Sequence, residues 1–318
     1  MTASATASAL PAGVTRQEPL ARYTSLKIGG PAAYFAAPRS PAELAAALRW
    51  AHAADIPART IGGGSNLLVA DDGFRGLVVK PAMSSWHVEA GQAGGTVLVA
   101  EAGAPLGNVA RALGKRGLGG LEWAATVPGT VGGAVVNNAG AFGGDTAGCV
   151  RAVWLVDPSG SERRVGPDEL EYGYRTSRLK RRELGEVAVS RAELSLVETP
   201  AGDAAARIAA FQAQRSAAQP RRSSAGSVFA NPPGAFAGQL LEEAGLKGRR
   251  QGDAQVSTQH ANFIVNLGRA RAADVYSLVR LAQDAVLARS GVWLRPEIEL
   301  FGCWSPEQRR GLQGLGDA

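Results

Sequence analysis

The sequence predicts an α+β protein made of three successive units between two polar tails. Short apolar runs bounded by glycine or proline indicate strands, and stretches with apolar residues three and four positions apart indicate helices. With 318 residues and 45% hydrophobic content, the chain is long enough to bury substantial cores. We place the units at residues 20–80, 81–218 and 219–303, and we expect disordered tails at 1–19 and 304–318.

The first unit combines one helix with short strands. Ser40 to Glu43 has the form of a helix start, because serine can cap the helix, proline fits its first turn and glutamate follows three residues after the cap. An apolar stripe then continues the helix to about Ala54. The runs 58–61 and 77–79 are apolar and are bounded by glycine or proline, which is typical of strands.

The second and third units contain longer elements. In the second unit we expect strands at 96–100, 153–156, 161–165 and 187–197, and helices at 106–113 and 202–218. The segment Asp157-Pro158-Ser159-Gly160 marks a turn between two of these strands. In the third unit we expect helices at 235–244 and 272–287 and strands at 263–266 and 293–301.

Composition excludes several classes of protein. No run approaches the 18 or so apolar residues of a membrane-spanning helix, and residues 1–18 lack the basic start and apolar block of a signal peptide. Cys149 and Cys303 form no disulfide framework, and His52, His87 and His260 are widely scattered. We therefore expect a cytoplasmic protein with no membrane partner and no metal site.

The formal charge of +6 suits nucleic acid, but it suits anionic nucleotides and diphosphates equally well. The basic residues cluster at 178–182, 221–222 and 247–250. These clusters are not interleaved with aromatic residues, as a platform for single strands requires. Charge alone does not choose between these ligands, and each cluster taken singly is more often a solvated surface.

Two glycine-rich loops are the first indication of a ligand. Residues 60–68 carry three consecutive glycines, and residues 119–144 carry a longer glycine-rich stretch. Glycine permits close approach of backbone N–H groups to an anion such as a diphosphate. Taken alone, the first loop is more often a tight turn, but two such loops suit a large dinucleotide. Neither loop has the GxGxxG or GxxxxGK[ST] pattern.

Together the loops resemble the FAD-binding fold of the vanillyl-alcohol oxidase type. The resemblance implies that residues 20–80 and 81–218 are two α+β subdomains with FAD between them. It also implies non-covalent binding, because no histidine or cysteine falls within either loop. The expected cofactor-binding residues are Gly62, Gly63, Gly64, Ser65, Asn66, Pro128, Gly129, Thr130, Gly132, Gly133 and Ala134.

Four further motifs narrow the resemblance to one family. They are Tyr23 to Pro31, Tyr174 to Ser177, Ala225 to Pro232 and Leu294 to Ile298. In this order and spacing the chain resembles the UDP-N-acetylmuramate dehydrogenase family, also called UDP-N-acetylenolpyruvoylglucosamine reductases, over about residues 20–303. The family acts in peptidoglycan precursor synthesis. The chain is similar to its compact subgroup, so we expect no inserted loop with a tyrosine that covers the substrate.

The resemblance implies a reaction and its participants. NADPH, as co-substrate, reduces FAD, and the flavin then reduces UDP-N-acetylglucosamine enolpyruvate to UDP-N-acetylmuramate. The partners are therefore this UDP-amino sugar and NADPH, with no nucleic acid, and 219–303 is the substrate-binding domain. Because both small molecules use one site in turn in this family, no separate nicotinamide-binding domain is expected. The chain is expected to be a monomer or a weak oligomer.

The resemblance assigns catalytic roles to Arg175, Ser227 and Glu297. Negative charge develops on the substrate carboxylate, and an arginine meets it with a fixed fork of donors. A buried, protonated glutamate donates to the same oxygens, and the serine hydroxyl protonates the neighbouring carbon. Taken singly, Ser227 is more often a loop serine and Arg175 a surface ion pair. Strand alternation alone makes Glu297 solvent-facing.

Further residues match positions that hold the substrate. They are Tyr174, Asn231, Gln255, His260 and Asn262. The chain departs from many relatives at Ala230, where they have lysine. Arg221 and Arg249 are the candidates to supply the missing positive charge near the substrate diphosphate.

Two other functions remain open from the sequence. A flavin oxidase or dehydrogenase of the same fold acting on another substrate would keep the glycine loops without needing Arg175, Ser227 and Glu297. A basic nucleotide- or nucleic-acid-binding protein without enzymatic activity would need neither the glycine loops nor these three residues. A yellow purified protein would argue against this second function, and steeply salt-dependent nucleic-acid affinity would support it.

Overall fold

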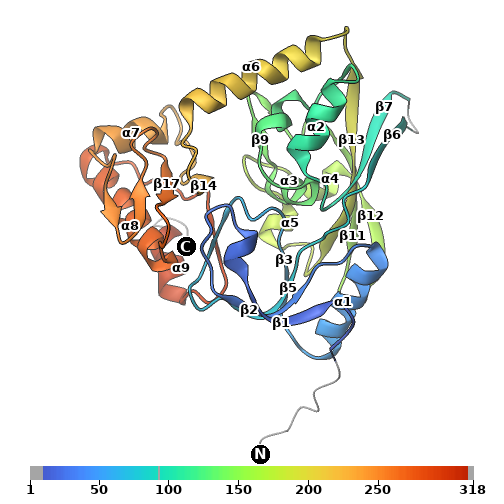
Figure 1. Ribbon diagram of the computed structural model, residues 1–318, viewed down its shortest axis with the longest axis horizontal. Helices are drawn as coiled ribbons and strands as arrows, with labels where there is room; N and C mark the ends of the chain where they lie inside the picture. Colours follow the sequence, from blue (N-terminus) through green and yellow to red (C-terminus); the bar gives the residue numbers. More distant parts are fainter. Residues whose placement is uncertain (1–9, 92–93, 314–318) are drawn as a thin grey trace, which may run out of the picture.

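A computed structural model describes residues 10–91 and 94–313. Figure 1 shows three parts arranged around a common centre, with the amino-terminal part in blue, the central part in green and yellow and the carboxy-terminal part in orange and red. Within these described ranges, no helix is long and apolar enough to cross a membrane.

The amino-terminal part is a four-stranded sheet in the order β1-β2-β5-β3, in which only β1 runs antiparallel to its neighbour. Its elements are β1 (Val14–Pro19), η1 (Leu20–Tyr23), β2 (Pro31–Ala36), α1 (Pro41–Ala53), β3 (Ala58–Thr60), β4 (Leu67–Val69) and β5 (Phe74–Val79). The predicted cap of α1 is present, because the Ser40 hydroxyl accepts the Glu43 N–H.

The predicted tail at 1–19 is wrong for its second half. Val14–Pro19 form β1, which pairs with β2, and Val14 is buried in the core beneath α1. The strand is stabilised by pairing with residues 12 to 22 positions away, which a local composition rich in alanine and serine does not reveal. Residues 1–9 of the predicted tail lie outside the described residues.

The central part is built on a sheet in the order β12-β11-β13-β7-β6, with β8 attached to β13. Its strands are β6 (Trp86–Ala90), β7 (Thr96–Glu101), β8 (Leu118–Gly119), β9 (Gly140–Ala141), β10 (Gly144–Asp145), β11 (Val150–Val156), β12 (Glu162–Val165) and β13 (Ala188–Glu198). Its helices are α2 (Leu106–Gly114), η2 (Glu122–Thr126), α3 (Val131–Asn137), α4 (Pro167–Leu170), α5 (Arg178–Arg181) and α6 (Asp203–Ala218).

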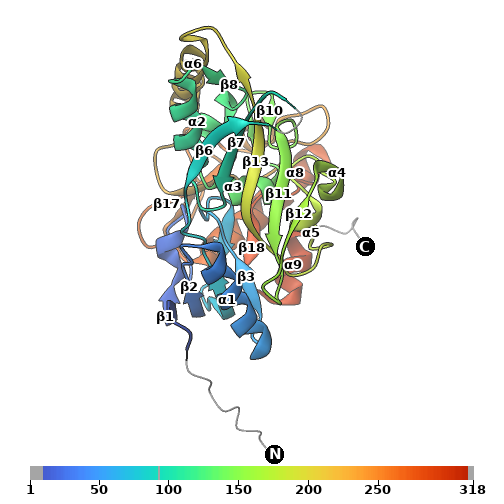
Figure 2. The ribbon, with the colours of Figure 1, turned by 90° about the vertical axis from the view of Figure 1, so that its right-hand side faces the viewer.

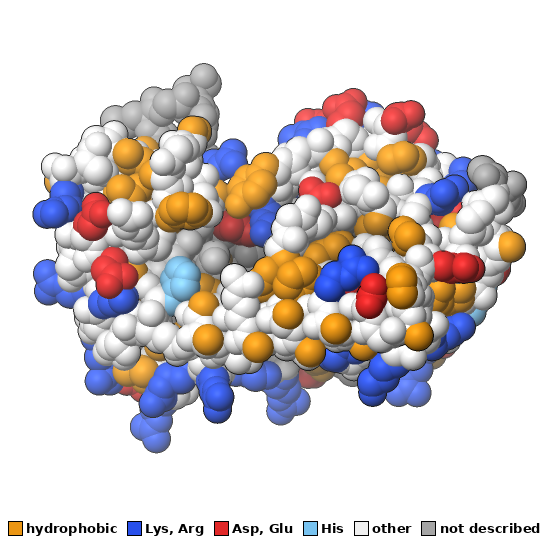
Figure 3. All heavy atoms as spheres, turned by 90° about the horizontal axis from the view of Figure 1, so that it is seen from above, with side chains coloured by type: hydrophobic (Ala, Val, Ile, Leu, Met, Phe, Trp, Pro, Cys, Tyr) orange, Lys and Arg blue, Asp and Glu red, His pale blue; other side chains and the backbone are white. Residues whose placement is uncertain are grey.

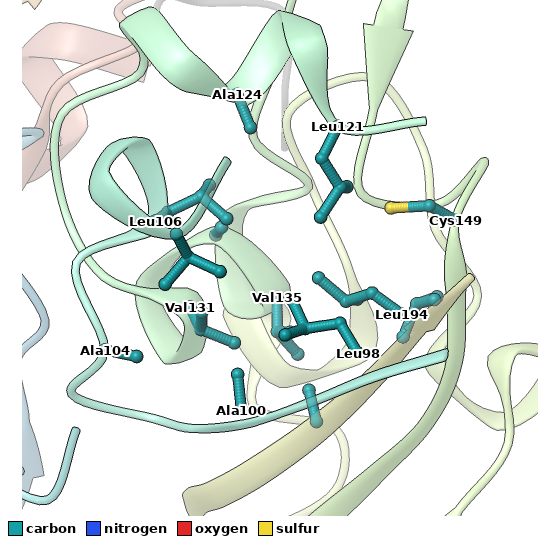
Figure 4. Close-up of a cluster of buried hydrophobic side chains, with 14 of the residues drawn as sticks. Leu98, Ala100, Ala104, Leu106, Leu121, Ala124, Val131, Val135, Cys149 and Leu194 are labelled. Atoms are coloured by element: carbon teal, nitrogen blue, oxygen red, sulfur yellow. The ribbon is translucent and has the colours of Figure 1, made fainter. Parts of the chain in front are cut away.

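Helices α2 and α3 pack on one face of this sheet. Figure 4 shows Leu106 of α2 and Val131 and Val135 of α3 facing Leu98 of β7 and Leu194 of β13. The turned view in Figure 2 shows β6, β7, β13, β11 and β12 side by side as one layer. This core fixes the loop before α3, where the second glycine motif lies.

The carboxy-terminal part contains a sheet in the order β14-β17-β16-β15. Its elements are β14 (Ser224–Ser227), α7 (Ala237–Glu243), β15 (Arg250–Gln251), β16 (Ala254–Val256), β17 (Phe263–Asn266), α8 (Ala272–Ser290), β18 (Glu299–Phe301) and α9 (Pro306–Gln313). The predicted tail at 304–318 is wrong over α9, where Leu312 is buried and Tyr276 donates to the Gln308 carbonyl. Residues 314–318 lie outside the described residues.

The predicted final strand is mostly absent. Only Glu299–Phe301 form β18, which pairs in parallel with β4 of the amino-terminal part. Before it, the chain turns toward β14, and Pro296 lies opposite Phe229 in an isolated bridge. Proline has no N–H to continue a ladder, so alternation cannot assign faces here.

The first and third parts share one hydrophobic core. Leu26 and Leu68 from the first part are buried in the same cluster as Leu241 and Val279 from α7 and α8. Together with the β4–β18 pairing, this core holds the segment Leu294 to Ile298 against the first glycine loop.

Candidate active site

A cavity of about 760 Å³ lies where the three parts meet. This size is usual for a small-molecule site. Figure 3 looks onto a face of the molecule that is hollowed between two raised sides. The cavity is lined by the two glycine loops, the turn that contains Arg175, the end of β14 and the segment that leads into β18.

The two glycine loops contact each other directly. A Cβ atom on Gly63 would lie 2.5 Å from the Gly129 Cα, so only glycine allows this approach. Gly64 has a φ of +61°, and the hydroxyl of Ser65 donates to the Pro128 carbonyl at 3.2 Å. The glycines therefore join the two loops into one wall of the cavity.

All the residues predicted to bind the cofactor line the cavity. They are Gly62, Gly63, Gly64, Ser65, Asn66, Pro128, Gly129, Thr130, Gly132, Gly133 and Ala134. Two of their side chains have structural partners. Thr130 caps α3 by accepting the Gly133 N–H, and Asn66 donates to the Glu297 carbonyl at 2.9 Å.

Arg175 lies at the tip of a tight turn. Gly173 and Thr176 exchange both of their backbone hydrogen bonds, so Tyr174 and Arg175 are the two residues between them. Arg175 has a φ of +57°, which residues other than glycine rarely adopt. Such backbone strain is often found at functional sites.

The guanidinium of Arg175 is held on three sides. Its Nη2 donates to the Gly140 carbonyl at 2.7 Å, its Nη1 donates to the Asn138 carbonyl at 3.5 Å, and its Nε lies 2.8 Å from Glu297 Oε1. Arginine carries five N–H groups. One N–H therefore remains on each terminal nitrogen for a ligand in the cavity.

Glu297 is largely shielded from solvent, contrary to the solvent-facing position that strand alternation alone predicts. Its side chain is 17% exposed. Burial raises the pKa of this carboxyl above its ordinary value, while Arg175, Lys180 and Arg295 act in the opposite direction. Burial is the largest of these effects, so the site favours the protonated acid more than water does.

Ser227 ends β14 beside the same cavity. Gly226 before it has a φ of +78°, and the pairing of β14 with β17 is irregular between Ser224 and Ser227. A bulge of this kind re-aims a side chain at the end of a strand. The Ser227 hydroxyl makes no hydrogen bond with the other described residues, so it is available to a ligand.

The residues predicted to hold substrate divide into two groups. Tyr174, Asn231 and Asn262 line the cavity, whereas Gln255 and His260 do not. The Gln255 amide donates to the Gly248 carbonyl, and His260 Nδ1 accepts the Asn262 N–H. The prediction that these two residues contact the substrate is therefore not supported by their positions.

Asn262 lines the cavity, but its side chain is used inside the protein. Its Nδ2 donates to the Phe229 carbonyl at 2.8 Å and its Oδ1 accepts the Phe229 N–H at 2.9 Å. The residue is 4% exposed. It therefore fixes the backbone two residues after Ser227.

Sequence reasoning missed several polar residues that line the cavity, among them Asn137, Lys180, Arg215 and Glu299. Lys180 belongs to the basic cluster 178–182, and nothing local shows which of its members faces inward. Glu299 lies two residues after Glu297, and burial raises the pKa of its carboxyl. The Asn137 Oδ1 is buried without a partner among the described residues.

The proposed replacements for the lysine absent at Ala230 are not at the cavity. Arg221 and Arg249 do not line it, whereas Arg215 and Lys180 do. Burial lowers the pKa of Arg215, and the nearby charge of Arg175 adds to this effect. Across the described ranges, no group of three or more histidine, cysteine, aspartate or glutamate residues is placed to hold a metal ion.

Comparison with known proteins defines first the class of protein. Residues 32–166 match the family described as FAD binding domain. Residues 219–301 match the family described as UDP-N-acetylenolpyruvoylglucosamine reductase, C-terminal domain. The molecule is therefore a FAD-binding oxidoreductase with a second domain at its carboxyl end, which confirms the predicted fold class.

Individual relatives identify the family. The chain is 44% identical over 296 residues to UDP-N-acetylenolpyruvoylglucosamine reductase from Chloroflexus aggregans, an alignment that covers 92% of this chain and 99% of that protein. UDP-N-acetylenolpyruvoylglucosamine reductase 2 from Symbiobacterium thermophilum is also 44% identical, and the alignment covers 92% of this chain and 93% of that protein.

A crystal structure of the same reductase from Thermus caldophilus has a TM-score of 0.74 and 37% identity, and it covers 91% of this chain and 98% of that one. The chain belongs to the UDP-N-acetylenolpyruvoylglucosamine reductase family. The family predicted from the sequence is thus confirmed.

Proposed function

We propose that this protein reduces UDP-N-acetylglucosamine enolpyruvate to UDP-N-acetylmuramate in peptidoglycan precursor synthesis, with bound FAD and with NADPH as the reductant. The observation that carries the proposal is the meeting of Arg175, Ser227 and Glu297 at one cavity with both glycine loops. These residues come from three separate segments of the chain. A flavin enzyme acting on an unrelated substrate does not need this combination.

The cavity fits FAD in size and lining. Two glycine-rich loops in backbone contact form one wall, and a Cβ atom at Gly63 would disrupt it. Asn137 offers an unpartnered amide oxygen to a donor such as the flavin ring. When bound, FAD supplies the transfer of a hydride to the substrate alkene.

Arg175 and Glu297 provide the electrostatic part of the mechanism. The two free N–H groups of Arg175 face the charge that develops on the substrate carboxylate. Glu297, whose pKa is raised by burial, donates from its protonated carboxyl to the same oxygens. Because both groups are held before the substrate arrives, little reorganisation is needed during the reaction, and loss of one such donor typically costs about 10²–10³ in rate.

Ser227 supplies the second hydrogen. The product gains one hydride and one proton relative to the enolpyruvyl group, and NADPH provides only the hydride. The Ser227 hydroxyl gives the proton to the carbon next to the carboxylate and regains one from solvent. A serine is a weak acid, but the carbon that it protonates is strongly basic.

The test separates the two halves of the reaction. The purified protein should be yellow, and NADPH should bleach its absorbance near 450 nm under anaerobic conditions. Adding UDP-N-acetylglucosamine enolpyruvate should then restore the oxidised spectrum. If the reduced protein does not respond to this substrate, the proposal fails and a flavin enzyme for another substrate is favoured.

The variant Ser227→Ala tests the proton donor. We expect NADPH to reduce its flavin at the wild-type rate, while transfer to the enolpyruvyl substrate slows by about 10²–10⁴-fold. Equal loss of both half-reactions would remove Ser227 from this role and would indicate a damaged fold.

A further inference from the structure

Lys180 lines the same cavity as the three proposed catalytic residues, and the reaction described above assigns it no role. It is on α5, whose first turn is capped by Ser177. The Ser177 hydroxyl accepts the Lys180 N–H at 3.2 Å and donates to the Val136 carbonyl of α3 at 2.6 Å. The short helix is thereby anchored on α3, and the Lys180 side chain lines the cavity.

The Lys180 ammonium donates to the Arg175 carbonyl at 3.0 Å. This carbonyl belongs to the left-handed residue at the tip of the turn. A hydrogen bond to it stabilises a backbone conformation that a residue with a side chain rarely keeps unaided. The direction of the Arg175 side chain, and with it the 2.8 Å contact between Arg175 Nε and Glu297 Oε1, depends on that conformation.

Lys180 also provides positive charge close to two partly buried carboxyls, those of Glu297 and Glu299. It lowers the pKa of Glu297 and of Glu299, opposing the effect of their burial. The other charges near Glu297 are Arg175 and Arg295. Those near Glu299 are Arg59 and Arg309.

The pKa of Lys180 itself is lowered by burial, and Arg175 and Arg295 contribute to the decrease. Glu299 and Glu297 oppose it, so the proton on Lys180 is favoured by the same two carboxyls that its charge affects.

We propose that Lys180 is a positioning residue for the reduction, because its hydrogen bond fixes the backbone of Arg175. The proposal rests on the proposed function, because it concerns the same half-reaction. In this arrangement Arg175 meets the substrate carboxylate only from the backbone geometry that Lys180 holds. The Lys180 charge also lowers the pKa of Glu297, opposing the larger effect of burial.

The experiment compares Lys180→Met, which removes the charge and the hydrogen bond, with Lys180→Arg, which keeps the charge. Arg181→Met is the matched control, since Arg181 lies on the same helix but pairs outward with Glu171 and Glu183. For each flavin-loaded protein, the rate at which the enolpyruvyl substrate reoxidises reduced flavin is measured against pH.

We expect Lys180→Met to transfer to the substrate about 10²-fold more slowly, the scale of loss seen when reacting groups are misplaced by about 1 Å. We also expect the fall in rate at alkaline pH to move to higher pH, because removing a nearby cation raises the pKa of Glu297. Lys180→Arg should transfer to the substrate more slowly than wild type, but its rate should begin to fall at the same alkaline pH. Arg181→Met should resemble wild type in both rate and pH profile.

A second readout does not depend on turnover. The infrared carbonyl band of protonated Glu297, identified by its loss in Glu297→Gln, should persist to higher pH in Lys180→Met than in wild type. An unchanged band and an unchanged pH profile in Lys180→Met would overturn the proposal. If wild-type reduced protein ignores the substrate, the proposed function has failed instead, so the two failures are distinct.

Discussion

The side-chain amide of Asn66 donates to the main-chain carbonyl of Glu297 at 2.9 Å, and the Asn66 carbonyl accepts the Glu299 N–H at 2.8 Å. The residue that ends the first glycine loop therefore binds the backbone on both sides of Ile298. Asn66, in the first glycine loop, and Glu297 are 231 positions apart in the chain. Their direct connection means that a change in the loop also displaces Glu297.

This connection predicts the effect of Asn66→Ala. We expect retention of flavin to weaken only moderately, because backbone groups form most of the loop wall, while transfer to the enolpyruvyl substrate slows about 10-fold or more through displaced Glu297. Ser65→Ala is the control, since its hydroxyl contacts Pro128 and not the acidic segment. Flavin affinity and single-turnover rates measure the two effects, and equal losses in both variants would contradict the prediction.

The contact between the two loops predicts the outcome of Gly63→Ala. The added methyl would lie 2.5 Å from the Gly129 Cα, so the loops must separate. We expect flavin to bind at least about 10-fold more weakly, a loss of about 1.4 kcal/mol in binding free energy. Fluorescence titration with FAD measures the affinity.

Gly166→Ala provides the matched control for that substitution. A Cβ atom there meets nothing within 4 Å, and the φ of −89° is open to any residue. We expect FAD affinity and melting temperature to stay at their wild-type values. Equal affinity in both alanine variants would show that the loop contact does not form the binding wall.

The amide of Asn262 predicts a stability effect rather than a simple loss of substrate binding. Asn262→Ala leaves the N–H and carbonyl of Phe229 without their buried partners. We expect the free energy of unfolding to fall by about 2–4 kcal/mol. Gln255→Ala, which removes one hydrogen bond to Gly248, should cost about 1 kcal/mol or less. Urea unfolding measures both free energies. A near-zero effect for Asn262→Ala would contradict the structural role and favour the original prediction that Asn262 binds the substrate.

Much of the fold follows from local sequence, and the exceptions have physical causes. The cap at Ser40 and the stripe after it predict α1 because these interactions lie within one helix. The strand Val14–Pro19 and the short β18 depend on pairing with distant segments, which local patterns do not report. For the same reason the alternation around Glu297 gives the wrong exposure for this residue.

The candidate site was predictable where a motif carries its residues. Arg175, Ser227 and Glu297 come from short motifs with a known order, and all three line the cavity. Lys180 and Arg215 were not predicted as site residues. The sequence does not show which residue of the basic cluster 178–182, or of the helix that contains Arg215, faces the cavity. Only the packing of α5 and α6 against the rest of the chain selects the residue that points inward.

Arg215 leads to a prediction about substrate affinity. It lines the cavity near Arg175, and its side chain has no ion pair or hydrogen bond with the other described residues. An unpaired, half-buried guanidinium suits an anionic group such as the substrate diphosphate. We expect Arg215→Met to raise KM for the enolpyruvyl substrate about 10-fold with a smaller change in kcat. Arg221→Met, outside the cavity, should change neither, and equal KM values for the two variants would contradict the prediction.

Glu299 predicts how stability depends on pH. Burial raises the pKa of this carboxyl in the folded protein above its ordinary value, despite Lys180, Arg59 and Arg309. Below its ordinary pKa the acid is protonated in both states and imposes no penalty. As pH rises through the folded pKa, the folded protein must accommodate a buried charge and loses stability.

Glu299→Gln removes that charge at every pH. We therefore expect its melting temperature, relative to wild type, to rise by about 2 °C between about pH 4 and pH 8. The exposed Glu198 offers a control in Glu198→Gln, whose melting temperature should keep a constant offset from wild type. A relative melting temperature of Glu299→Gln that falls with rising pH would mean that the ionised carboxylate stabilises the fold through Lys180, contrary to this assignment.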